Sequence, residues 1–535
     1  MNYMKSILPF SFVAVLLAGC GAAAIVSTPI GNIDNTPVKE AELAEAQAHH
    51  WGHLDLQQDT IPGMSVDKAY AELLKDKKGT TVVVAVIDSG IDIDHEDLND
   101  NIWINKDEVP NNGKDDDGNG YVDDIHGWNF LGTAYDEQLE LVRLLASGDT
   151  SHPRYSEAQA EYDKARGGAE SSKMRYEQIY QMANNAQEAL SAHFGTDDFS
   201  QEDVDAITSE DDSLKQYIAA AKQMYGFGFG SLTEAMNELK GGLDYFSDQL
   251  NYNYNLELKG RTTGDNPDNF SQTVYGDNNV KPVKKSESHG THVAGIIAAE
   301  RNNGIGMDGV ANNVKIMAVR AVPNGDEYDK DVALAIRYAA DNGAKVINTS
   351  FGKYYSPHSD KVREAIAYAG SKDVLIVNAA GNEGADIDTV NVFPNDAFGT
   401  GPEVSDTFLA VGSITSSYGS KLVSGFSNYG AINVDVFAPG SAVYSTTPEN
   451  EYDSKSGTSM AAPSAAGVAA LIRSYYPKLS ASEVKQIMME SGLKINREVV
   501  IGGDASKVGS FTSMSRSGRI VNAYNALVMA AQKSK

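Results

Sequence analysis

The chain has 535 residues, of which 41% are hydrophobic, enough for a sizeable core in one large α/β domain with insertions or in several average domains. Lys and Arg total 44 against 73 Asp and Glu, a formal net charge of −29. This acidic balance argues against nucleic acid and anionic membrane surfaces as partners, and it favours solubility and cation binding.

Residues 1–20 have the layout of an export signal. They read MNYMKSILPFSFVAVLLAGC, in which one early lysine precedes an apolar run too short to span a bilayer comfortably. The ending LAGC resembles a bacterial lipobox, which implies that residues 1–19 are a lipoprotein signal peptide and that Cys20 is lipidated. In the alternative interpretation the signal is an ordinary cleaved one and Cys20 is incidental. We therefore expect an exported protein, lipid-anchored in the bacterial cell envelope on the periplasmic face or the outer surface.

The residues after Cys20 predict a tether. From Gly21 to about Asn35 the chain is small and polar, which suits a flexible connection, and we place the tether at residues 20–50. Because Cys20 is the only cysteine, the chain cannot form an internal disulfide. Its stability must therefore come from packing or from metal ions.

Continuous apolar runs rich in β-branched residues predict buried strands of a parallel sheet. Stretches with helical spacing alternate with them, which favours an α/β fold: an open, mostly parallel sheet with helices on both faces. In such sheets a ligand site lies beyond the carboxyl ends of the strands, where Asp88, Asn348, Ser350 and Asn382 stand. The predicted strands are 80–90, 314–322, 344–352, 374–382 and 408–414, and the predicted helices are 66–76, 292–300, 331–343 and 360–372.

The segment NNGKDDDGNGYVDD, at residues 111–124, predicts a calcium-binding loop. Its spacing resembles the first nine positions of an EF-hand loop, with Gly120 at the sharp turn. The usual glutamate at the twelfth position is absent and His126 stands there, so the ligand set must differ. The alternative is an acidic, solvated turn without a metal. The predicted ligands are Asp115, Asp117, Asn119, Tyr121 through its backbone oxygen, Asp123 and Asp124.

Residues 132–262 predict a largely helical insertion. Apolar residues recur with helical spacing in MRYEQIYQMANNAQEALSAHF and in the segments that follow, which glycines interrupt. The insertion divides a domain into a first part at 51–131 and a second part at 263–535. From its position we expect a helical arm that limits access to a site or binds a protein partner. The alternative is a surface pack that only stabilises the fold.

The segment GTSMAAP, at residues 457–463, surrounds Ser459 with small residues and a proline that suits the first turn of a helix. A serine hydroxyl is a weak nucleophile unless a base takes its proton and a third group orients that base. The chain supplies His289 in ESHGTHVAG and Asp88 in VAVIDSGID. We therefore predict a nucleophilic serine site made of these three residues.

Five motifs taken together resemble the signature blocks of the subtilisin-like serine peptidases. They are VIDSGIDIDHEDL, HGTHVAG, NTSFG, NAAGNEG and GTSMAAP, in the order Asp, His, Ser that subtilisin has. The resemblance implies that Ser459 forms an acyl-enzyme, that His289 is the general base and then acid, and that Asp88 orients the imidazole. It implies that Asn382 donates to the oxyanion together with the backbone N–H of Ser459. His292 is expected to be a packed helix residue.

The same resemblance implies broad endopeptidase activity on extended polypeptides, because substrate would pair with backbone by β-augmentation. It also implies a second calcium site at Asp97 and Asn303. Two alternatives remain: a catalytically silent protein of the same fold, and an esterase or peptide ligase, since an acyl-enzyme can pass to other nucleophiles. The substrate-binding residues that it implies are Ser350, Phe351, Gly352, Ala379, Ala380 and Gly381.

Overall fold

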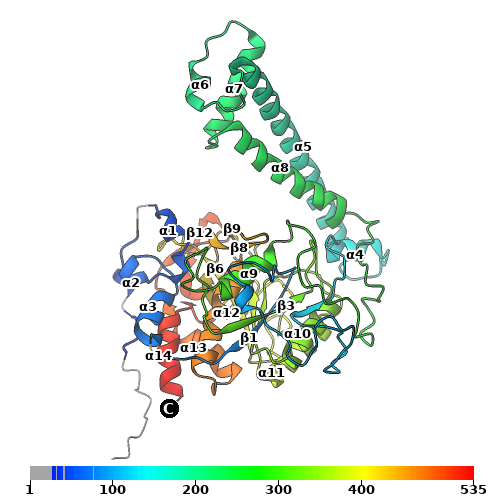
Figure 1. The fold of residues 1–535 in the computed structure, drawn as a ribbon, viewed down its shortest axis with the longest axis vertical. Coiled ribbons are helices and arrows are strands. Elements are labelled where there is room, and N and C mark those ends of the chain that lie inside the picture. The colour runs from blue at the N-terminus through cyan, green and yellow to red at the C-terminus, as the bar shows by residue number, and fades with distance from the viewer. Residues whose placement is uncertain (1–26, 32, 40–41, 76, 535) are drawn as a thin grey trace, which may run out of the picture.

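The computed structural model describes residues 27–31, 33–39, 42–75 and 77–534, so the predicted signal peptide and Cys20 lie outside it. Within these ranges a nine-stranded sheet runs through the main body (Figure 1), in the order β10-β13-β7-β6-β5-β4-β1-β3-β2. Every neighbouring pair is parallel except β10 and β13. This confirms the predicted open, mostly parallel sheet. The strands are β1 (Val82–Asp88), β2 (Gly127–Asn129), β3 (Val314–Arg320), β4 (Val346–Thr349), β5 (Leu375–Ala379), β6 (Phe408–Ile414), β7 (Val436–Pro439), β10 (Leu493–Lys494) and β13 (Arg519–Ile520).

Helices cover both faces of this sheet. Val84 and Val86 of β1 belong to a core shared with α9, α12, α13 and α14, whereas Ala85 and Ile87 belong to a core shared with α10 and α11. Because alternate residues of a strand point to opposite faces, an apolar run without alternation forms a strand buried on both sides. The helices are α9 (His289–Ala298), α10 (Asp329–Asp341), α11 (Ser359–Ser371), α12 (Thr458–Tyr475), α13 (Ala481–Ser491) and α14 (Ala523–Lys533).

Two antiparallel hairpins and several short helices complete the main body. The predicted helix at 66–76 is α3 (Val66–Ala69) followed by a π-helical turn, η3 (Tyr70–Leu74). The other α-helices and strands of the main body are α1 (Glu45–Ala48), α2 (Leu56–Asp59), β8 (Val443–Thr447) with β9 (Glu451–Lys455), and β11 (Glu498–Ile501) with β12 (Asp504–Ser510). The 3-10 helices are η1 (Ile33–Asn35), η2 (Trp51–His53), η4 (Asn99–Asn101) and η6 (Phe511–Ser513).

The described part of the predicted tether packs on the main body. The backbone N–H of Ile30 donates to Asn525 Oδ1 (2.7 Å), and Ile33 is 5% exposed in an apolar cluster with Tyr418. The Tyr418 hydroxyl donates to the carbonyl of Ile33 (3.2 Å). At Ile30 and Ile33 the prediction of a flexible tether is therefore wrong, because Ile33 is buried and Ile30 is partly buried against the domain.

The insertion forms a helical arm that projects from the main body (Figure 1). The long α5 ends at Gly195, whose φ of 71° is a left-handed conformation that terminates helices. Ser200, Asp211 and Ser231 accept backbone N–H groups at the starts of the next three helices. All these elements fall within the predicted 132–262, so the helical content agrees with an insertion there. They are α4 (Glu140–Ala146), α5 (Tyr155–Phe194), α6 (Gln201–Ala206), α7 (Asp212–Gly226), α8 (Leu232–Asp248) and the π-helical η5 (Gln249–Asn253). Of the helices in the described ranges, none combines the length and apolar character needed to cross a bilayer.

Candidate active site

The carboxyl ends of three neighbouring strands bring predicted site residues together. Ile87 of β1 lies opposite Thr349 of β4, and Thr349 lies opposite Asn378 of β5. Asp88 is the last residue of β1, and Ser350 directly follows β4. Because the strands are parallel, these polar ends meet at one edge of the sheet, where open α/β sheets bind ligands.

Asp88 and His289 form a hydrogen-bonded pair at this edge. Asp88 Oδ1 lies 2.7 Å from His289 Nδ1 and also accepts the N–H of Ser89 (2.7 Å). The Asp88 side chain is 1% exposed and the His289 side chain 39%. Burial lowers the pKa of His289, but the charge and hydrogen bond of Asp88 outweigh it and leave the pKa above its usual 6.5. With Nδ1 bonded to the carboxylate, Nε2 is left as the nitrogen that can accept a proton.

Ser459 lies in the first turn of α12, half-buried, and α12 packs against α9, the helix that His289 begins. Its Oγ donates to the backbone carbonyl of Ser350 (2.9 Å), and Ser350 Oγ donates to the carbonyl of Ser459 (2.8 Å). The hydroxyl is thus bonded to Ser350 rather than to His289. Catalytic hydrogen bonds often form only when substrate is bound, and rotation of the Ser459 side chain would release its hydroxyl.

Asn382 and the backbone of Ser459 border one small space. Asn382 Oδ1 accepts the N–H of Thr458 (2.8 Å) and its hydroxyl (3.0 Å), so the amide nitrogen Nδ2 is left to donate. A β-carbon placed on Gly457 would lie 3.6 Å from Asn382 Nδ2, 3.5 Å from Ser459 N and 3.6 Å from Ser459 Cβ. Two potential donors beside a nucleophile can stabilise an oxyanion. Thr458, which the sequence analysis missed, is the residue that orients Asn382.

A buried ion pair that the sequence analysis also missed joins the loops carrying Asp88 and His289. Arg320, the register partner of Asp88, donates through Nε to Glu287 Oε1 (2.6 Å), and both side chains are 0% exposed. The same oxygen accepts the N–H of Gly90 (2.7 Å). Glu287 therefore fixes the turn after Asp88 against the turn before His289. An arginine ending an apolar strand was the signal in the sequence.

The two predicted substrate-binding segments differ in whether their backbone groups are already hydrogen-bonded within the protein. Gly352 is exposed after β4, whereas the N–H of Ala380 donates to Val411 and its carbonyl accepts from Asn428 Nδ2. The N–H of Gly381 donates to Thr458 Oγ1 (3.0 Å). These groups are already bonded within the protein, so they are not free to pair with a substrate backbone, and substrate contact by Ala379, Ala380 and Gly381 stays a prediction. Pairing with an extended chain is left to Ser350, Phe351 and Gly352.

His292 is a packed helix residue, as the sequence predicts. Its side chain is fully buried, and Nε2 lies 3.0 Å from the carbonyl oxygen of Asp453. Burial, followed by the charge of Lys455, lowers the pKa of His292 to about 3. It is therefore neutral at physiological pH and lies outside the proton transfers of the site.

The acidic loop gathers three carboxylates, one of which the sequence analysis missed. Ligand atoms of Glu108, Asp115 and Asp117 all lie within 4.8 Å of one another. Glu108 is 5% exposed, and its Oε2 is buried without a hydrogen-bond partner. Such an oxygen costs free energy unless something binds it, and mutually repelling carboxylates call for a cation. All donors are oxygens, so the residues fit calcium, with Glu108 in place of the glutamate missing at position 126.

The other predicted ligands of this loop have different tasks. The carboxylate of Asp123 accepts the N–H groups of Asn112 (3.1 Å) and Gly113 (2.8 Å) and is not one of the three clustered carboxylates, so its role as a ligand stays a prediction. Asp124 is buried, and its carboxylate accepts hydrogen bonds from Tyr338 (2.6 Å), Asn105 and Asn119. These bonds attach the loop to the main body. Asn119 Oδ1 accepts the N–H of Tyr121 (2.7 Å).

Asp97 and Asn303 lie together, but hydrogen bonds already satisfy the carboxylate. Asn303 Nδ2 donates to Asp97 Oδ1 (2.6 Å), and Oδ2 accepts the N–H of Met307 (3.2 Å). Burial raises the pKa of Asp97. No oxygen of this carboxylate is left without a donor, so the geometry adds no support for the second predicted calcium site beyond the proximity of the two residues.

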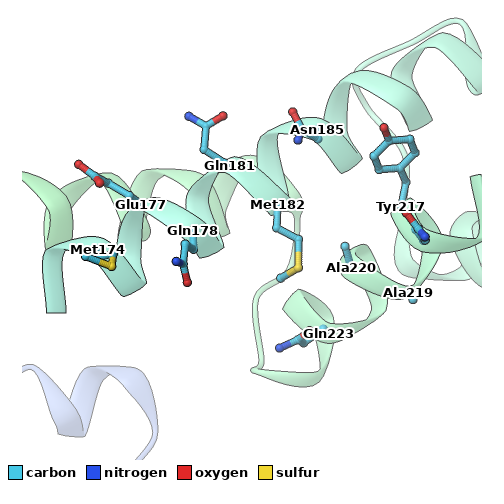
Figure 2. Close-up of a pocket in the computed structure, with 11 residues that line it drawn as sticks. Met174, Glu177, Gln178, Gln181, Met182, Asn185, Tyr217, Ala219, Ala220 and Gln223 are labelled. Atoms are coloured by element: carbon cyan, nitrogen blue, oxygen red, sulfur yellow. The ribbon is translucent and has the colours of Figure 1, made fainter. Parts of the chain in front are cut away.

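A groove of about 810 Å³ lies on the arm between α5 and α7 (Figure 2). Met174 and Met182 of α5 and Tyr217 of α7 line it together with several amide side chains. Glu177 is the one charged residue among those that line it. The groove contains no nucleophile beside a base, so we assign no chemistry to it.

Comparison with known proteins gives the following similarities. The model of the Subtilase family, Peptidase_S8, matches residues 79–510. A thermophilic serine proteinase of Bacillus sp. (strain AK1) is 39% identical over 47% of this chain and 54% of its own length. Thermitase of Thermoactinomyces vulgaris is 39% identical over 49% of this chain and 83% of its own. Subtilisin DY of Bacillus licheniformis is 38% identical over 40% and 73%. The chain thus spans about half of the first relative's length.

Proposed function

The chain belongs to the subtilase family, and we propose that it is a serine endopeptidase that hydrolyses peptide bonds of extended polypeptides. The observation that carries the proposal is the 2.7 Å hydrogen bond between His289 and the buried Asp88, at the sheet edge that also holds Ser459 and Asn382. Such an arrangement gives a serine the base and the oriented imidazole that it needs to act as a nucleophile.

In the proposed reaction, the Ser459 hydroxyl gives up its hydrogen bond to Ser350. Its Oγ then attacks the substrate carbonyl carbon while His289 Nε2 takes the hydroxyl proton. Asp88 holds the imidazole and stabilises the imidazolium. Asn382 Nδ2 and the N–H of Ser459 donate to the oxyanion. His289 then protonates the leaving amine, and a water molecule activated by the same imidazole hydrolyses the acyl-enzyme.

A fluorophosphonate probe followed by mass spectrometry of the labelled peptides tests the proposal. We expect an adduct on Ser459 and none on the exposed Ser456, whose Oγ accepts the N–H of Ala442. Absence of labelling would favour the catalytically silent alternative. The esterase and ligase alternatives are tested by matched peptide and ester substrates, and ester turnover without peptide hydrolysis would contradict an endopeptidase.

Gly457→Ala is expected to lower kcat by about 10²–10³-fold without lowering stability. The added methyl group would meet its neighbours at ordinary contact distances of 3.5 Å and more, and the φ of 164° suits any residue. It would nevertheless fill the space between Asn382 Nδ2 and Ser459 N, and losing one oxyanion donor costs about that factor. Turnover and thermal unfolding of the variant check this, with Gly419→Ala, whose β-carbon site is open to 3.7 Å, as control. Unchanged kcat would show that the oxyanion lies elsewhere.

We propose that the cluster of Glu108, Asp115 and Asp117 binds a structural calcium ion. Support comes from the unpartnered buried oxygen of Glu108 and from the all-oxygen donor set. Since the chain has no cysteine pair, an ion that holds residues 105–124 would replace the stabilisation that exported proteins obtain from disulfides.

Calcium is expected to stabilise the fold by about 2.7 kcal/mol at a hundred times its dissociation constant, which raises Tm by several degrees. Glu108→Gln should remove most of this gain, whereas Asp107→Asn, at an exposed neighbouring position, should retain it. Thermal unfolding with calcium and with a chelator measures the difference. An equal Tm in both conditions for the wild-type protein would contradict the site.

We further propose that Cys20 carries a lipid that anchors the protein in the bacterial cell envelope, supported by the sequence LAGC after an apolar run. Incorporation of a clickable fatty acid that persists in Cys20→Ala would contradict this.

We also propose that the arm binds a protein partner, supported by its projection and its methionine-lined groove. Activity and substrate choice that stay unchanged after deletion of residues 135–260 would contradict it.

A further inference from the structure

The root of the insertion holds the residues that directly follow the predicted substrate-binding segment. Lys353 is buried, and its Nζ donates to Glu140 Oε2 of α4 (2.9 Å). The Tyr355 hydroxyl donates to Glu161 Oε2 of α5 (3.1 Å), and its ring lies in the apolar cluster at the base of the arm. Residues directly after Gly352 are therefore packed between the main body and the arm.

Arg154, at the start of α5, makes the contact with Tyr354. Its guanidinium is fixed by Glu157, through Nε to Oε2 (2.8 Å) and Nη2 to Oε1 (2.9 Å), and it lies 3.7 Å from the centre of the Tyr355 ring. Its remaining Nη1 donates to the backbone carbonyl of Tyr354 (2.6 Å). A planar guanidinium held on two sides presents its third side in a defined direction. The arm thereby fixes the backbone of Tyr354.

The side chain of Tyr354 extends this contact to the oxyanion loop. Its hydroxyl donates to Glu383 Oε2 and accepts from Asn428 Nδ2 (3.2 Å). The same Glu383 oxygen accepts the backbone N–H of Asn382 (2.8 Å) and Asn428 Nδ2 (3.1 Å). Burial, followed by the bond to Glu383, raises the pKa of Tyr354, so the hydroxyl stays a donor at physiological pH.

Glu383 is an exposed carboxylate directly after Asn382, the proposed oxyanion donor, so it lies beside the place where the scissile bond would be held. A free carboxylate at such a place would attract a lysine or arginine side chain of the substrate. Three neutral donors on Oε2 hold Glu383 in place and weaken the attraction of that oxygen for a cation, although the carboxylate keeps its charge. The contacts of Tyr354 therefore bear on which side chains the site accepts.

We propose that the insertion sets the substrate preference of the site: Arg154 positions Tyr354, and Tyr354 keeps Glu383 occupied, which disfavours a cationic substrate side chain before the scissile bond. Arg154 and Tyr354 are positioning residues here, since neither touches the reacting atoms. This inference rests on the proposed endopeptidase function.

Two peptides that differ only before the scissile bond, with lysine in one and norleucine in the other, test the inference on the full-length protein. Tyr354→Phe removes the hydroxyl and keeps the ring, and Arg154→Ala removes the donor to the Tyr354 carbonyl. Both variants are expected to raise the ratio of kcat/KM for lysine over norleucine by about two- to fivefold, the worth of a partly exposed ion pair. Arg166→Ala, which removes an exposed pair with Glu170 farther along α5, should leave the ratio unchanged.

The ratio separates positioning from mere stability, because partial unfolding lowers turnover of both peptides equally. Fluorophosphonate labelling of Ser459 in each variant reports whether the site is intact. A ratio within the error of the wild-type value in both variants, with normal labelling, would overturn the inference and leave the proposed function standing. Wild-type protein that hydrolyses neither peptide and takes no label would overturn both.

Discussion

His289→Ala is expected to lower kcat by about 10⁶-fold, because without an acceptor the Ser459 hydroxyl cannot lose its proton as it attacks. The stability cost should be small, since the side chain is 39% exposed and its hydrogen bond is to Asp88. Steady-state hydrolysis of a peptide, together with a thermal unfolding curve, measures both quantities. His358→Ala, at a surface pair with Asp268, is the matched control and should retain full activity.

The double variant His289→Ala/Ser459→Ala sharpens this prediction. Residues that act as one unit are strongly non-additive, so the double variant should be no slower than either single variant. If the two losses multiplied instead, the residues would act in separate steps and the proposed proton transfer would be wrong. Retention of more than about 1% of wild-type kcat by His289→Ala would also contradict it.

The sequence predicted the centre of this fold because that centre depends on patterns that one strand or helix carries by itself. β1, β3 and β5 are buried on both faces, so their apolar runs are continuous and readable. A parallel sheet then brings the ends of such strands to one edge. Asp88 and Ser350 could therefore be placed at that edge from the sequence. The short strands β2, β10 and β13 have two or three residues each and carry no readable pattern.

Features that depend on the direction of a side chain could not be predicted. Asp123 and Asp117 look alike in the acidic loop, yet Asp123 turns back to the N–H groups of Asn112 and Gly113. Glu108 precedes Asp115 by seven residues and enters the cluster only because the chain folds back. In the same way, Ile30 and Ile33 lie in a polar segment, and only the surface that they meet shows that these two residues pack on the domain.

Asp88→Asn tests whether catalysis needs the negative charge of the buried carboxylate beside His289. The amide keeps the size of the carboxylate but carries no charge and can hold the imidazole in the wrong tautomer, so kcat should fall by about 10⁴-fold. Asp94→Asn, at an exposed pair with Lys281, should leave kcat unchanged. Normal activity of Asp88→Asn would mean that the buried carboxylate has no part in catalysis.

The pH dependence of kcat/KM gives this prediction a second readout with a definite sign. His289 must be neutral to accept a proton, so activity is lost as pH falls through its pKa, which Asp88 holds above 6.5. When the charge of Asp88 is removed, burial and the charge of Lys455 act on the imidazole, and both lower its pKa because both disfavour the charged form. The acidic limb of the variant should therefore move to lower pH, although its maximum is far smaller. A limb that stayed in place or moved to higher pH would show that the titrating group is not the imidazole beside Asp88.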